Sequence, residues 1–138
     1  MGLFKNIFGS GTSAPPFSPL QVDIHSHLIP GVDDGAVDLE DSLNLIRELH
    51  KLGYRKLITT PHVMSDAYRN TPETILGGLE KVRQALKQEG IEVEIEAAAE
   101  YYLDEWFIQN LEHTELLPFG GEKKYLLFET SYVARPMS

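Results

Sequence analysis

Two histidines separated by a single residue, His25 and His27, stand out because the whole chain contains only five histidines. They close a short apolar stretch that is expected to form a β-strand. Side chains on a strand alternate between its two faces, so residues i and i+2 point to the same side. Two imidazoles on one side of a strand can bind a single metal ion, and this pair is therefore the first candidate site.

Other side chains able to bind a metal follow the next two apolar runs. His62 comes directly after one run, and Glu100 ends the following one. Glu100 would give a metal held by the histidine pair three protein ligands and leave a position for water. Asp33 or Asp34, which lie in a turn between two glycines, could join His62 at a second metal.

Each of these residues has a simpler explanation when it is taken alone. A His-x-His pair arises by chance, a lone histidine is more often a hydrogen-bonded polar residue, and Asp-Asp-Gly is usually only a turn. Their occurrence at the ends of three successive predicted strands is what favours a metal site. The remaining helix-borne histidines, His50 and His113, are given no role.

Strands and helices alternate along the chain, and this order predicts how the candidate ligands come together. Apolar runs predict strands at 20–27, 55–62, 91–100 and 123–130, with Pro61 expected to stop the second of them. Helical periodicity predicts helices at 38–53, 71–90 and 104–113. A βα repeat with short connections predicts a mostly parallel sheet, and such sheets carry their functional groups at the carboxyl ends of the strands.

The predicted helices carry start and stop signals. Asp38, Thr71 and Asp104 are the expected N-caps, and Gly53 and Gly90 are expected to end the two longer helices. The residues expected on the buried faces are Leu39, Leu43, Ile46, Leu49 and Leu52 in the first helix, and Ile75, Leu76, Leu79, Val82 and Leu86 in the second.

The composition excludes several classes of function. The net charge of −9 argues against a nucleic-acid partner, which needs a basic surface. The absence of cysteine excludes disulfides, thiolate ligands and a cysteine nucleophile, so any metal (Mn, Fe, Zn or Mg) must bind His, Asp or Glu. No apolar run reaches the ~18 residues of a membrane span. A His and carboxylate site suits metal-assisted hydrolysis of phosphoesters or, less specifically, amidohydrolase chemistry.

The chain divides into two parts. Residues 1–19 contain a Gly/Ser/Pro-rich stretch and are expected to be a flexible tail or linker, whereas residues 20–138 are expected to form the structured domain.

Three segments, DIHSHLIPGVDDG, TTPH and AAAEYYL, resemble in order and spacing the N-terminal half of the polymerase and histidinol phosphatase (PHP) superfamily. Within it, the bacterial capsule-biosynthesis tyrosine phosphatases of the CpsB/CapC type are the most similar. The resemblance implies an α/β fold whose βα repeats form the N-terminal half of a distorted (β/α)7 barrel. It covers only half because a complete barrel needs ~250 residues.

The resemblance also implies roles for the candidate ligands. His25 and His27 resemble ligands of a first metal, Glu100 a carboxylate shared by a first and a second metal, and Asp34 and His62 ligands of a third. The register of the motif favours Asp34 over its neighbour. The implied metal is manganese, with iron or zinc as alternatives and up to three ions in a complete barrel. No catalytic residue beyond the metal ligands is implied, and no substrate-binding residue is identified.

The activity that the resemblance implies is hydrolysis of phosphotyrosine on a bacterial tyrosine kinase that controls capsular or exopolysaccharide synthesis, with a metal-bridging hydroxide as nucleophile. The implied location is the cytoplasm, either free or peripheral to the inner membrane. Two alternatives stay open. One is a PHP phosphoesterase acting on histidinol phosphate or a nucleic-acid end, and the other is a truncated, non-catalytic remnant. Open edges at the first and fourth strands also predict that the chain either associates with another chain, such as a second copy, or is marginally stable.

Overall fold

The computed structural model describes residues 20–131, which form two small parallel β-sheets, two long helices and one short helix. The elements are β1 (Val22–Asp23), α1 (Leu39–Lys51), β2 (Lys56–Thr59), β3 (His62–Val63), α2 (Pro72–Glu89), β4 (Glu94–Ala97), β5 (Glu100–Tyr102), α3 (Glu105–Asn110), the 3-10 turns η1 (Leu111–His113) and η2 (Gly121–Lys123), and β6 (Leu127–Glu129). The tail expected at 1–19 lies outside the described residues. None of the helices within 20–131 is long and apolar enough to cross a membrane.

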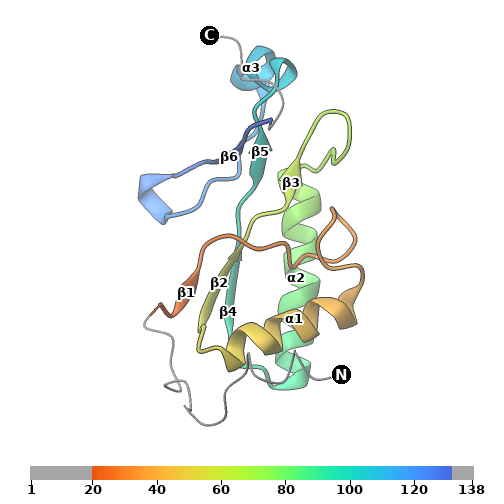
Figure 1. Cartoon of the computed structure of the whole chain (residues 1–138), viewed down its shortest axis with the longest axis vertical. Helices are drawn as coiled ribbons and strands as arrows, with labels where there is room; N and C mark the ends of the chain where they lie inside the picture. Colours follow the sequence, from red (N-terminus) through yellow and green to blue (C-terminus); the bar gives the residue numbers. More distant parts are fainter. Residues whose placement is uncertain (1–19, 132–138) are drawn as a thin grey trace, which may run out of the picture.

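All the strand pairs are parallel, which confirms the parallel α/β prediction. The first sheet has the order β1-β2-β4 and the second the order β3-β5-β6. The second sheet continues from the first along the long axis of the molecule, and α3 lies beyond its end (Figure 1). Helix α2 packs on β4, and α1 packs on α2.

The predicted strands at 55–62 and 91–100 are wrong as single elements, because each is two strands that belong to different sheets. The backbone groups at the two breaks bond outside the ladders. The Thr60 N–H donates to the Ser26 carbonyl at 2.7 Å, and the Ala99 N–H donates to the Leu117 carbonyl at 3.0 Å. The next residue after Thr60 is a proline, which has no N–H to offer a ladder.

These breaks change where two candidate ligands lie. His62 and Glu100 were expected just after the carboxyl ends of two strands, but they are the first residues of β3 and β5, where they are paired with each other. They therefore lie at the junction between the two sheets. The predicted strands at 20–27 and 123–130 are also too long, since only Val22–Asp23 and Leu127–Glu129 pair with a neighbour as strands.

The predicted helix starts are confirmed. The Asp38 carboxylate accepts the Asp41 N–H at 2.9 Å, Thr71 forms a capping box at the start of α2, and the Asp104 carboxylate caps α3. Gly90 ends α2 in the left-handed conformation at φ 66°. The end of α1 differs from the prediction, because Leu52 is its C-cap and Gly53 follows it.

The buried faces of the helices are narrower than the periodicity predicts. Leu39, Leu52 and Leu76 were expected in the core but are 40%, 64% and 45% exposed. Leu39 is the first residue of α1 and Leu52 is its C-cap. Leu76 is turned ~100° from the buried Ile75 and so leaves the face that meets the sheet. The other predicted helix residues lie in the core as expected (Leu43, Ile46, Ile75, Leu79, Val82 and Leu86) or pack against it (Leu49). The remaining core residues are Ala85 of α2, Leu57, Ile95 and Tyr101 of the strands, and Leu28, Ile29, Ala99 and Phe107.

Two adjacent glycines in the middle of α2 have different surroundings. Helix propensity alone predicts that Gly77 and Gly78 each weaken the helix by ~1 kcal/mol relative to Ala. A Cβ at Gly77 would meet nothing within 4 Å, whereas a Cβ at Gly78 would overlap the Cγ2 methyl of Ile29, which is fully buried. Gly78 therefore permits close packing of α2 against the segment that follows the histidine pair.

The two glycines provide a matched test. Gly77→Ala should raise the free energy of unfolding by ~1 kcal/mol, because it gains helix propensity in open space. Gly78→Ala should lower it, because overpacking of ~1–3 kcal/mol outweighs the same gain. Urea unfolding of both variants measures the difference, and equal stabilities would contradict the close packing of α2 on Ile29.

Candidate metal centre

The five predicted ligands come together at the junction of the two sheets. Together with Glu129, they form three overlapping groups, and the ligand atoms within each group lie within 4.8 Å of one another. The groups are His25 with His27 and Glu100, His27 with Asp34 and His62, and His62 with Glu100 and Glu129. Residues more than 100 positions apart in the chain thus meet in one small volume.

The ring orientations of His25 and His27 are set by hydrogen bonds on their Nδ1 atoms. Nδ1 of His25 lies 2.7 Å from the Thr60 hydroxyl, and Nδ1 of His27 lies 2.7 Å from Oδ2 of Asp33. Both Nε2 atoms face Glu100, at 3.7 and 3.5 Å from its carboxylate oxygens. The two imidazoles thereby present their free nitrogens to a shared carboxylate.

Asp33 is fully buried and orients the site rather than joining its ligand groups. Its carboxylate contacts Nδ1 of His27 and accepts the Gly35 and His62 N–H groups, each at 3.0 Å. Burial alone would raise the pKa of Asp33, but the bond from His27 and the two N–H groups together lower that pKa below its usual range. The bond to Asp33 is also the main reason that the pKa of His27 is raised. An ionised Asp33 can only accept, so His27 donates from Nδ1 and directs Nε2 into the site.

The neighbouring Asp34 has the opposite surroundings. Its side chain is 64% exposed, and its Oδ1 lies 3.5 Å from Nε2 of His62. The chemistry of the sequence alone left Asp33 and Asp34 open as alternatives. In the structure only Asp34 directs an oxygen into a ligand group, whereas the Asp33 oxygens are occupied by hydrogen bonds.

The turn that carries both aspartates is closed by backbone hydrogen bonds. The Ala36 N–H donates to the His27 carbonyl at 3.0 Å, and the Gly31 N–H donates to the Ala36 carbonyl at 2.8 Å. Gly31 has φ 70°, a conformation that glycine adopts without strain. A Cβ at Gly35 would overlap the His27 backbone, so only glycine fits there. The expectation that these two glycines frame the turn is confirmed.

His62 and Glu100 carry buried atoms that the protein leaves unsatisfied. Nδ1 of His62 and Oε2 of Glu100 are 3.1 Å apart, but their geometry is unsuited to a hydrogen bond, and neither atom has another hydrogen-bond partner. A buried polar atom without a partner costs ~1–3 kcal/mol. A divalent cation near these atoms would satisfy the carboxylate, and nitrogen and oxygen donors without cysteine suit such a cation. The residues therefore fit a metal.

Glu129 is a site residue that the sequence reasoning missed. Its Oε2 lies 3.5 Å from Nδ1 of His62, on the other side of the ring from Asp34. The signal that could have found it is the one used for the other ligands, a carboxylate at the end of a predicted strand. It was overlooked because the fourth strand was considered only as an element of the fold.

The parallel α/β fold and this cluster of three histidines with carboxylates define the chain as a candidate metalloprotein of the parallel α/β class. Comparison with known families agrees with that class. The family model described as "Capsular polysaccharide synthesis, CpsB/CapC" matches residues 21–135, and the chain belongs to this family.

Two relatives from this family carry phosphatase names. The chain is 32% identical to the tyrosine-protein phosphatase YwqE of Bacillus subtilis, over 78% of this chain and 42% of the relative. It is 31% identical to the tyrosine-protein phosphatase CpsB of Streptococcus pneumoniae, over 80% of this chain and 45% of the relative. The chain thus spans less than half the length of these relatives.

A solved structure is also similar to this fold. It comes from work on YwqE of B. subtilis and CpsB of S. pneumoniae, described as unique metal-dependent tyrosine phosphatases. It matches with a TM-score of 0.71 and 31% identity, over 80% of this chain and 44% of the solved chain.

The contrast between the two aspartates generates a prediction for the metal-free chain. Asp33→Asn should lower the free energy of unfolding by ~1–3 kcal/mol, because one of its buried acceptors becomes a donor facing N–H groups. Asp34→Asn should change it by less than ~0.5 kcal/mol, since the side chain is exposed. Urea unfolding in the presence of a chelator measures both. A larger loss for Asp34→Asn would contradict the assigned orientations.

Proposed function

We propose that this chain forms the metal-binding part of a metal-dependent protein-tyrosine phosphatase that acts in the synthesis of surface polysaccharide. The names of the relatives and the family description support the reaction and the process. The proposed substrate is phosphotyrosine on a bacterial tyrosine kinase, and the proposed location is the cytoplasm, either free or at the inner membrane. The two consecutive parallel sheets are proposed to be the N-terminal half of a (β/α)7 barrel.

One observation carries this proposal. The Nε2 atoms of His25 and His27 face the buried Glu100, while their Nδ1 atoms are already bonded to the protein. Histidines on an ordinary polar surface bond to solvent, and two of them do not usually direct their free nitrogens at one buried carboxylate.

Each ligand has a proposed place in the site. His25, His27 and Glu100 hold one divalent metal, Asp34 and His62 contribute to another, and Glu100 is shared with an additional position. Manganese is the proposed metal, with iron or zinc as alternatives. A bound cation of this kind supplies Lewis acidity, which lowers the pKa of water and offsets charge on a phosphoryl group. Asp33 keeps His27 oriented, and Glu129 either binds a metal or orients His62 in the same way.

Metal binding by the 138-residue chain tests the ligand assignment without requiring activity. We expect stoichiometric manganese after dialysis, measured by elemental analysis, and its loss in the double variant His25→Ala/His27→Ala. Asp33→Asn should weaken binding ~10–100-fold, because it removes the group that orients a ligand. His113→Ala is the matched control, since His113 lies on η1 outside all three ligand groups. Equal metal content in the double variant and the control would refute the assignment.

Hydrolysis is best tested in a chimera, because the chain spans less than half of its relatives. Residues 21–135 would replace the matching segment of B. subtilis YwqE. We expect manganese-dependent hydrolysis of a phosphotyrosyl peptide, lost in His25→Ala/His27→Ala and retained in His113→Ala. A chimera that folds and binds manganese but hydrolyses only histidinol phosphate or a nucleic-acid end would favour the first alternative. Absence of all hydrolysis would favour the non-catalytic remnant.

A further inference from the structure

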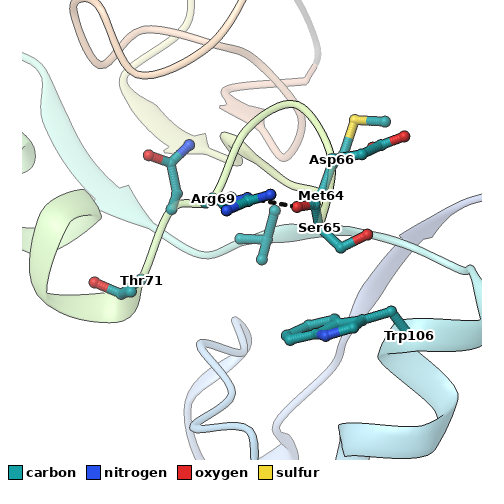
Figure 2. Close-up of a pocket in the computed structure, with 8 residues that line it drawn as sticks. Met64, Ser65, Asp66, Arg69, Thr71 and Trp106 are labelled. Atoms are coloured by element: carbon teal, nitrogen blue, oxygen red, sulfur yellow. Dashed lines mark hydrogen bonds between the residues drawn. The ribbon is translucent and has the colours of Figure 1, made fainter.

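A cleft of about 630 Å³ opens beside the candidate metal centre and uses none of its ligands. One wall is the segment from Val63 to Thr71, and the other is Trp106 of α3. Figure 2 shows Arg69 and Trp106 facing the same space from opposite sides, with Ser65 and Asp66 at its rim. The volume lies within the range of ligand pockets, which is ~300–1,000 Å³.

The walls of the cleft are held in place by hydrogen bonds. The Ser65 hydroxyl donates to the carboxylate of Asp104, the N-cap of α3, at 2.9 Å and so joins the two walls. The Met64 N–H donates to the Tyr68 carbonyl at 2.8 Å and closes the loop on itself. The cleft is therefore formed before any ligand arrives, which reduces the entropic cost of binding.

Arg69 gives the cleft a specific chemical preference. Its Nε donates to the Ser65 carbonyl at 2.6 Å, which fixes the plane of the guanidinium. Among the described residues neither Nη group has a protein acceptor, so the outer donors face the cleft. A fixed guanidinium fork matches a carboxylate in geometry and charge. Beside it, the half-exposed indole of Trp106 and Val63 offer an apolar surface.

The cleft lies next to the candidate metal centre along the chain. Val63 directly follows His62 in β3, which places their Cα atoms ~3.8 Å apart. The Asn70 amide donates to the His62 carbonyl at 2.8 Å, and the Tyr68 ring stacks on the His62 ring at 5.6 Å. An extended peptide advances ~3.3 Å per residue. A substrate with its phosphate at the metals would thus reach the cleft within a few residues.

We propose that this cleft is a specificity subsite that binds an acidic residue flanking the phosphotyrosine of a peptide substrate. The carboxylate of that residue pairs with Arg69, and its carbon chain or an adjacent apolar side chain lies against Trp106. The inference rests on the proposed function. The inference goes beyond the proposed function because it assigns which residues next to the phosphotyrosine the enzyme prefers. A small aryl phosphate has no such residue and leaves the subsite empty.

The test uses the fluorescence of Trp106, which is the only tryptophan in the chain and lines the cleft. The 138-residue chain is titrated at constant Mn²⁺ with peptides that carry a non-hydrolysable phosphonate analogue of phosphotyrosine. One peptide has glutamate on both sides of the phosphonate residue, and the other has glutamine at the same positions. Unphosphorylated tyrosine versions of both complete the set. We expect the glutamate phosphonate peptide to bind about tenfold more tightly than the glutamine peptide, as for a charge-assisted hydrogen bond.

Two variants assign the preference to one side chain. Arg69→Ala should abolish the glutamate preference, and Lys81→Ala should retain it, because Lys81 is an exposed cation on α2 that does not line the cleft. Equal affinities for the two phosphonate peptides, or a preference that survives Arg69→Ala, would overturn the subsite. Trp106 emission that changes with protein concentration alone would place a second copy in the cleft and would also overturn it.

The peptide set separates failure of the subsite from failure of the proposed function. If the phosphonate adds nothing to binding but the Arg69-dependent glutamate preference persists, the subsite stands and the phosphatase proposal fails. If the phosphonate strengthens binding but Arg69→Ala has no effect, the phosphatase proposal stands and the subsite fails.

Discussion

The buried carboxylate of Asp33 is the contact on which the arrangement of the candidate site depends. It joins the ring of His27 and the N–H of Gly35, which lie in one closed turn, to the backbone of His62 at the start of β3. A carboxylate with no solvent exposure is stable only when its oxygens are satisfied in this way. The same bonds set the position of β3 relative to the first turn, so the geometry of the ligands and the meeting of the two sheets have one common cause.

The parts of the structure that were predictable from sequence are those with local causes. Asp38, Thr71 and Asp104 cap their helices through hydrogen bonds to residues three positions away. Gly31 is required by its own backbone conformation. The grouping of the five predicted ligands was also foreseeable, because a βα repeat brings successive strands side by side whatever their detailed bounds.

The parts that were not predictable depend on contacts between distant segments. Pro61 marks the end of β2, but nothing in the runs around Thr60 and Ala99 marks a change of sheet, which depends on the bonds of their N–H groups to the carbonyls of Ser26 and Leu117. Periodicity could not distinguish Leu76, which is exposed, from Ile75, which is buried. The chemistry of Asp33 and Asp34 is the same, so only the family resemblance favoured Asp34. The buried role of Asp33, whose oxygens bond to His27, Gly35 and His62, was not predictable.

The chain passes directly from the first sheet to the second twice, between β2 and β3 and between β4 and β5, so the candidate ligands lie where the two sheets are joined. His25, His27 and Asp34 belong to the side of the first sheet, whereas His62, Glu100 and Glu129 begin or end strands of the second. A cation held by members of both sets would act as a cross-link between the two sheets. Each sheet has only three short strands and would have little stability by itself. With metal bound, the two sheets would unfold together in one transition. After chelation, each sheet would unfold with its own stability.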